Sequence, residues 1–107
     1  MMSTQFKSYY AVIFTSIKSV HDDGYSAMAE KMVILAQQQP GFLGMESARD
    51  EIGITVSYWE NEEAILAWKK NVDHLEAQLF GQKKWYDSYK VRICKVEREY
   101  AFHRDTN

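Results

Sequence analysis

The stretch YYAVIFTSI, which runs from Tyr9 to Ile17, decides the fold that the sequence predicts. It is rich in aromatic and β-branched residues, as β-strands are. In a strand, one face would carry Tyr9, Ala11, Ile13 and Ile17, and the other would carry Tyr10, Val12 and Phe14. A strand with one face in water alternates between apolar and polar residues instead. The sequence therefore predicts a strand that is covered on both faces.

A helix is predicted after this strand, because apolar residues recur there at spacings of three and four. They are Tyr25, Met28, Met32, Leu35 and Ala36. Asp22 or Asp23 would cap the start of this helix. Pro40-Gly41 would end it, since proline cannot continue a helix.

Two strands and a second helix are predicted next. The strands are Phe42–Arg49 and Ile54–Trp59, which a short turn would join as a hairpin. Asn61 would cap the second helix, which begins at Glu62. We expect this helix to break near Lys70, with Asn71 as a second cap, and to continue to Phe80.

A last strand is predicted over Val91–Phe102, after a turn or short helix at residues 84–89. The order of elements is then β-α-β-β-α-β, which is that of a ferredoxin-like α+β domain. The 107 residues are enough for one domain only. We expect a single domain over residues 1–107, with a core at about 8–102 and flexible tails.

Two helices cover only one face of a four-stranded sheet, which leaves the second apolar face of Tyr9–Ile17 without cover. Exposed apolar patches of this size are rare on monomers. A second copy of the chain, packed sheet against sheet, is the simplest cover, and two-fold symmetry is the most common symmetry of oligomers. The sequence therefore predicts a homodimer through the sheet face.

The composition is that of a globular protein, with 46% hydrophobic and 14% aromatic residues. The formal net charge of −2 gives no reason to expect a nucleic acid or a membrane as partner. Asp87 and Glu97 interrupt the basic residues that lie between Lys83 and Arg98. We find no signal-peptide pattern and no apolar run near the ~20 residues that span a bilayer, so we expect a cytoplasmic protein.

No motif carries chemistry by its spacing alone, since the sequence lacks a phosphate-binding loop, a paired-histidine metal motif and a nucleophile elbow. Cys94 is the single cysteine, expected to be small and buried, and no metal site is predicted. Trp59, Trp68 and Trp85 fall on neighbouring elements, where they would line one cavity for a flat apolar or aromatic ligand. Tyr86 would place a hydroxyl at its rim.

Two polar residues would act in this cavity. His74 is predicted at the border of the buried side of its helix, where it would give or take a proton. Arg92 begins the last strand and would bind a carboxylate or an enolate. Each candidate also has a structural reading: packing for the aromatic residues, a bond to backbone or solvent for His74, and a surface ion pair for Arg92.

From about Tyr10 to Phe102 the chain resembles the antibiotic biosynthesis monooxygenase family. The similarity lies in the turn Gln39–Gly44, the strand end Ser57–Trp59, Trp68 on the helix and the stretch His74–Tyr86. The resemblance implies a dimeric α/β barrel, in agreement with the argument from the sheet. It also implies a choice of activities, because the family includes cofactor-free oxygenases of polycyclic aromatic and quinol-like substrates, heme-degrading oxygenases and members of unknown role.

The heme-degrading branch can be compared residue by residue. Trp59 and Trp68 look like two tryptophans of that branch, the second of which lies in its heme pocket. The axial histidine of the branch falls ten residues after the second tryptophan, where this chain has Gln78, and His74 lies one helical turn earlier. The pocket asparagine of its first strand has no counterpart in the segment Ala11–Phe14. These departures weigh against heme as a cofactor.

Three hypotheses follow from the sequence. The first is a cofactor-independent monooxygenase of a small aromatic or quinol-like substrate, in which His74 moves the proton, Trp68 and Trp85 hold the ring and Arg92 stabilises the anion. The second is a heme-binding or heme-degrading protein. The third is a non-catalytic dimer that binds a small apolar ligand or a partner.

Overall fold

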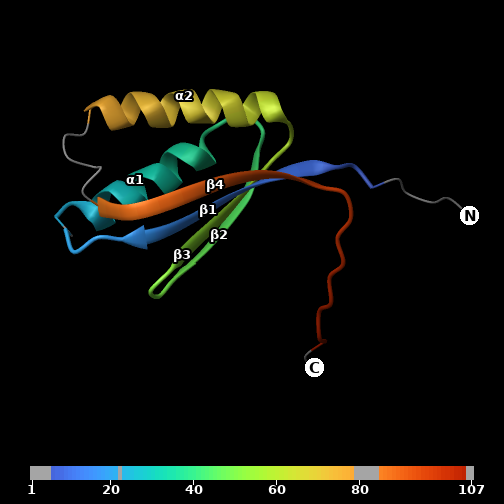
Figure 1. Ribbon diagram of the computed structural model, residues 1–107. Helices are drawn as coiled ribbons and strands as arrows, with labels where there is room; N and C mark the ends of the chain where they lie inside the picture. The colour runs from blue at the N-terminus through green and yellow to red at the C-terminus, as the bar shows by residue number, and fades with distance from the viewer. Residues whose placement is uncertain (1–5, 22, 79–84, 106–107) are drawn as a thin grey trace, which may run out of the picture.

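The computed structural model describes residues 6–21, 23–78 and 85–105. Its elements are β1 (Tyr9–Lys18), α1 (Tyr25–Gln37), β2 (Phe42–Arg49), β3 (Gly53–Trp59), α2 (Glu62–Gln78) and β4 (Tyr86–Val96). This β-α-β-β-α-β order confirms the predicted ferredoxin-like fold. Figure 1 shows both helices on one side of the sheet, with the other side left bare.

The sheet has the order β2-β3-β1-β4, and each pair of neighbours is antiparallel. The register places Val12 opposite Ser57 on one side and Ile93 on the other. The helix-side face of β1 carries Tyr10, Val12, Phe14 and Ser16, in register with Trp59, Ser57, Thr55 and Gly53 of β3. The opposite face, which we call the open face, carries Tyr9, Ala11, Ile13, Thr15 and Ile17 of β1, with Ile54, Val56 and Tyr58 of β3. The predicted assignment of apolar residues to the two faces of β1 is confirmed.

The core is small and centres on Trp59. This side chain is fully buried, and its indole Nε1 donates a hydrogen bond of 2.9 Å to the Oγ of buried Ser57. The other buried apolar side chains are Ala11, Met28, Ala36, Ile65 and Trp85. Met28 and Ala36 belong to the apolar stripe that predicted α1, so this helix packs on the face that the spacing indicated.

The turn before β2 fixes where α2 begins. Gly41 has a positive φ of 84°, and a Cβ on this residue would lie 2.7 Å from the Cβ of Ala64 in α2. The backbone N–H of Glu60 donates to the Gly41 carbonyl at 2.8 Å. One turn into the helix, the N–H of Ala64 donates to the Asn61 Oδ1 at 2.8 Å, which confirms the predicted cap.

Two helix predictions were wrong. The first residue before α1 is Gly24, with a φ of 78° and no side-chain cap, so the described Asp23 is not the cap, and Asp22 lies outside the described residues. The second helix does not break at Asn71. The Asn71 amide donates to the Ala67 carbonyl one turn earlier and to the Gln39 Oε1, and these bonds hold it inside the helix.

The last strand was also misplaced. It begins at Tyr86, inside the segment predicted as a turn, and ends at Val96, six residues before the predicted end at Phe102. Cys94 on this strand is exposed, contrary to the expectation of burial. It lies opposite Ala11 on the open face, which no other part of the described chain covers.

Candidate functional site

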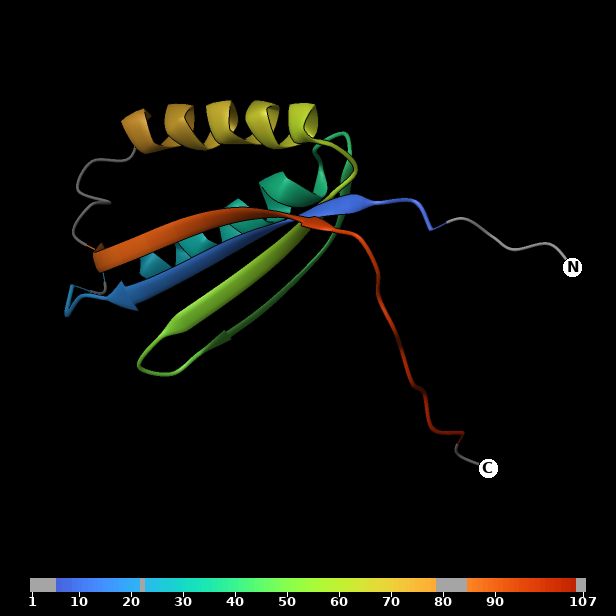
Figure 2. The same ribbon diagram turned by 45° about the vertical axis from the view of Figure 1, so that its right-hand side comes forward.

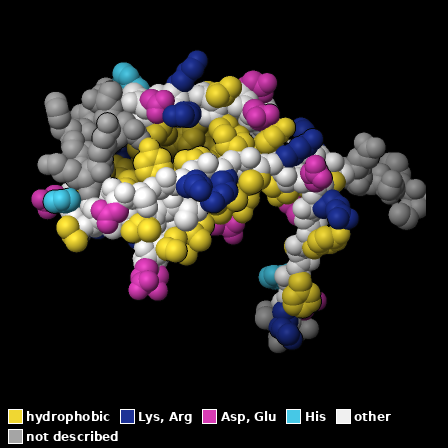
Figure 3. All heavy atoms as spheres, viewed as in Figure 1, with side chains coloured by type: hydrophobic (Ala, Val, Ile, Leu, Met, Phe, Trp, Pro, Cys, Tyr) yellow, Lys and Arg dark blue, Asp and Glu magenta, His cyan; other side chains and the backbone are white. Residues whose placement is uncertain are grey.

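The helix-side face of β4 is open to solvent, although both helices lie on that side of the sheet. Tyr89, Val91 and Ile93 are 59%, 48% and 53% exposed. Their partners across the ladder are Ser16, Phe14 and Val12, all on the helix-side face of β1. Figure 3 shows apolar side chains gathered in a recess between α2 and the sheet. We call this recess the hollow, with Val12, Phe14, Tyr89, Val91 and Ile93 as its floor.

The hollow exists because α2 is anchored over β2 and β3, at the end of the helix-side face that lies away from β4. Ile65 is buried and Trp68 half-buried, and the Trp68 ring stacks on Trp59 of β3 with centroids 5.9 Å apart. Phe42 of β2 packs edge-on against the same Trp59 ring at 5.4 Å. The helix is thus fastened over β2 and β3, which leaves β4 uncovered. Two of the three predicted tryptophans come together here.

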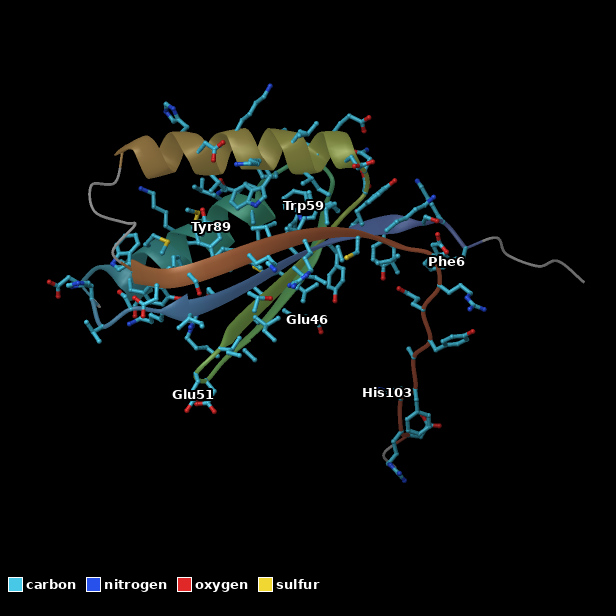
Figure 4. The ribbon with its side chains drawn as sticks, viewed as in Figure 1. Phe6, Glu46, Glu51, Trp59, Tyr89 and His103 are labelled. Carbon is cyan, nitrogen blue, oxygen red and sulfur yellow. The ribbon has the colours of Figure 1, made fainter. Side chains whose placement is uncertain are left out.

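Phenol and phenyl rings gather at the other end of the floor. Phe14 stacks on Tyr89 at 5.3 Å and meets the edge of Tyr86 at 5.5 Å. Tyr86 also meets Tyr25 of α1 at 5.9 Å. Figure 4 shows Tyr89 and Trp59 both rising from the sheet toward the helices. Tyr86 therefore lies within an aromatic cluster at this end of the hollow.

Trp85 is not part of the tryptophan stack. Its Nε1 donates to the carbonyl of Asp23 at 2.7 Å, and its own carbonyl accepts from the N–H of Ser19 at 2.8 Å. The ring is buried and meets Tyr25 edge-on at 6.4 Å. These contacts tie the loop after β1 to the start of β4. They account for Trp85 as a structural residue.

His74 lies on the outer side of α2 and is exposed. The inward positions of this helix are Ala64, Ile65, Trp68 and Val72. Because each residue turns a helix by about 100°, His74 points about 200° away from Val72. The structure therefore places it away from the sheet and not at the border of the buried side.

The structure does not bring Arg92 to the tryptophans either. It pairs with Ile13, so its side chain belongs to the open face, on the far side of the sheet from Trp59. The arginine on the helix side is Arg49, at the end of β2 opposite Gly53. Its guanidinium donates to the Oγ of buried Ser16 and lies 5.9 Å from the Tyr25 ring centroid. From sequence, only the alternation of side chains along β2 could have indicated the direction of Arg49. That alternation assigns a face only when the pairing of β2 with β3 is known.

The sequence profile of the antibiotic biosynthesis monooxygenase family matches residues 8–78. The chain belongs to this family. YqjZ of Bacillus subtilis (strain 168), an uncharacterized protein, is 52% identical over 101 residues, which make up 92% of this chain and 89% of YqjZ.

Two solved structures have the same fold as this family member at low sequence identity. A variant of SnoaB, a cofactor-independent oxygenase from Streptomyces nogalater, superposes with a TM-score of 0.64 and 11% identity, over 88% of this chain and 97% of SnoaB. A variant of MhuD with two manganese protoporphyrin IX bound per active site gives a TM-score of 0.57 and 20% identity, over 86% of this chain and 99% of MhuD. Both likenesses establish the fold alone.

The histidines of this family member do not suit a heme in the hollow. The chain has three, and His74 points away from the sheet. His21 lies in the loop after β1, and His103 lies in the C-terminal segment far from α2 (Figure 4). The donor set therefore does not fit a heme held by a histidine of the same chain.

Within residues 6–21, 23–78 and 85–105, no three His, Cys, Asp or Glu side chains gather closely enough to hold a metal ion. In the same part of the chain, neither helix combines the length and the apolar character that crossing a bilayer requires.

Proposed function

We propose that the chain is a cofactor-independent monooxygenase that oxidises a small aromatic or quinol-like substrate bound in the hollow. The observation that carries the proposal is the exposure of Tyr89, Val91 and Ile93 on a face that the helices should cover. An apolar recess with a few polar groups at its edge is the usual form of a small-ligand site. Membership of the monooxygenase family supports the oxygenase chemistry.

The residues of the hollow suit a flat ring. Trp68 is half-buried, so part of its indole remains available to a ligand while Trp59 supports it from below. Tyr86 and Tyr89 bring phenol groups to the opposite end. A ring held between these two aromatic ends would lie on the aliphatic side chains of Val91 and Ile93, which exclude water from it.

The reaction needs only the substrate and dioxygen. An activated CH₂ group, such as that in the keto form of a phenol, loses a proton to give an enolate. The enolate passes one electron to dioxygen, and the resulting substrate radical and superoxide combine to form a peroxide. Loss of water from the peroxide leaves a carbonyl group. One oxygen atom stays on the substrate, and the other leaves as water with the two hydrogens of the CH₂ group.

The proton of the CH₂ group passes to water, since His74 lies on the outer side of α2. The tyrosine end of the hollow stabilises the enolate that remains. A phenol hydroxyl is a donor that stabilises a developing enolate oxygen. Tyr86 and Tyr89 are therefore the positions at which we place the oxygen of the substrate.

The dimer is the second part of the proposal. The open face carries Ile13, Ile17, Ile54 and Val56, and Ile17 and Ile54 are both exposed. A second copy packed on this face would cover them at the ~10 Å spacing of stacked sheets. The hollow lies on the other side of the sheet, so each subunit would keep its own site.

Oxygen uptake with a panel of hydroquinones and naphthols tests the activity. Ile93→Trp should abolish it by filling the floor of the hollow, whereas Leu66→Trp, on an exposed position of α2, should leave it intact. His74→Ala should also keep the wild-type rate. Equal rates for Ile93→Trp and the wild type would refute the site. Binding of the ring without any oxygen uptake would identify a non-catalytic binding protein, and a shifted Soret band with hemin would favour the heme alternative.

A further inference from the structure

The chain after β4 forms an extended segment, residues 97–105, which we call the C-terminal arm. It has no regular secondary structure, and all of its residues are exposed. Tyr100 and Phe102 are 88% and 84% exposed, which is extreme for aromatic side chains. Both views show the arm leaving the sheet on the side away from the two helices (Figures 1 and 2). The arm thus runs out on the side of the open face.

The root of the arm is fastened to the open face. The Tyr9 hydroxyl donates a hydrogen bond to the Glu99 carboxylate, and the Tyr9 ring meets the edge of Tyr58 at 5.9 Å. Tyr58 in turn donates to the Glu46 carboxylate at 2.7 Å. This chain of contacts fixes the direction in which the arm departs. Beyond Glu99 no side-chain bond from the arm to the described body is present.

Fixing an extended backbone costs roughly 1–2 kcal/mol for each residue. One side-chain hydrogen bond at the root does not offset this entropy cost for the residues beyond Glu99. Contacts with another surface are therefore needed to order the arm. Its exposed aromatic rings are the groups that would supply them.

We propose that the arm clasps the second copy of the chain in the dimer, with Tyr100 and Phe102 buried against that copy. This inference rests on the proposed dimer through the open face. Two stacked sheets lie ~10 Å apart. An extended segment of nine residues reaches ~30 Å, so the arm passes the edge of the partner's sheet and reaches its helix layer. Tyr100, the fourth residue after β4, reaches ~13 Å, which is the level of that sheet edge.

Sedimentation analysis of the dimer tests this proposal. The double variant Tyr100→Ser/Phe102→Ser should raise the dimer Kd by about 10- to 100-fold, since two aromatic anchors are removed from the interface. Val20→Ser, an exposed apolar residue in the loop after β1, is the matched control and should leave the Kd unchanged. An unchanged Kd in the double variant would refute the proposed contact between the arm and the second copy, but it would not refute the dimer itself. A monomeric wild type at all concentrations would overturn both.

Trypsin provides a readout that does not depend on the variants. Arg98 and Arg104 lie in the exposed arm. If the arm clasps a partner, cleavage after Arg98 should slow as the protein concentration rises through the dimer Kd. The double variant should lose this dependence. Protection that is independent of concentration would instead show the arm folded back on its own subunit, and rapid cleavage at every concentration would show it free; either result overturns the proposal.

Discussion

Replacing Ile93 with alanine should reduce the stability far less than the same replacement at Ile65. Both are isoleucines on the helix side of the fold. Ile65 of α2 is 5% exposed, whereas Ile93 on the floor of the hollow is 53% exposed. The pair therefore tests whether the hollow is open in solution, and it requires no knowledge of the ligand.

The expected sizes follow from burial. Ile→Ala in a closed core costs about 2–5 kcal/mol, part of which comes from the cavity that is left. For Ile65 we take about 3 kcal/mol and subtract roughly 0.5 because alanine is the better helix former. Ile93 already has half of its surface in water, and its loss leaves no closed cavity. Its cost is about 1 kcal/mol, to which the lower strand propensity of alanine adds a few tenths.

Urea unfolding at one fixed protein concentration measures both losses, since the stability of a dimer depends on concentration. A difference of about 1.2 kcal/mol corresponds to roughly 1 M in the urea midpoint at the slopes usual for a domain of this size. Equal midpoints for Ile93→Ala and Ile65→Ala would mean that Ile93 is buried in solution. The hollow would then be closed, and the argument for a ligand there would fail.

Gly41→Ala should cost about 2–4 kcal/mol, because alanine is strained at a φ of 84° and its Cβ would lie 2.7 Å from Ala64; a loss under about 1 kcal/mol in urea would contradict this tight turn. Glu99→Ala should lower the pKa of Tyr9 from about 12 toward its usual 10.0, since the bond to Glu99 is the main cause of the rise. That bond stabilises the fold below pH 10.0 and is lost as the pH rises through about 12, and NMR titration of the tyrosine ring carbons follows it; an unmoved pKa would exclude the bond. Trp85→Phe should cost about 1 kcal/mol, because the Nε1 bond to the loop carbonyl is removed, and an unchanged urea midpoint would show that this bond contributes nothing.

The fold followed from sequence wherever an element is buried on at least one face. The two apolar faces of β1 and the stripe of α1 are strong periodic signals, and both elements lie where these signals indicated. The edge strand β4 has a weaker signal, because most of its residues are exposed and its charged residues occur on both faces. Residues 86–89 were therefore predicted as part of a turn or short helix. The Asn71 error has another cause, since the bond that keeps this residue helical goes to its neighbour Gln39 and is invisible in a local pattern.

The sequence indicates which aromatic residues come together more readily than it indicates where polar side chains point. Large aromatic side chains contact their neighbours across elements, as Trp59 of β3 does with Trp68 of α2, and as Tyr86 of β4 does with Tyr25 of α1. The direction of a polar side chain depends on strand register, and one position separates the two faces of a sheet. That single step places Arg92 on the open face and Arg49 on the helix side. Burial of Trp85 against a backbone carbonyl 62 residues away also has no local signature.

The strand order has a consequence for how this protein is made. β1 is synthesised first and sits between β3 and β4, yet its pairing with β4 joins Tyr9 to Val96. A growing chain that has already formed β1, β2 and β3 still carries an unpaired edge on β1, lined by apolar side chains, until the last strand leaves the ribosome. Such edges bind other extended chains. Chains arrested before residue 86 should therefore aggregate or be held by chaperones, and folding to the native sheet should begin only when β4 is released.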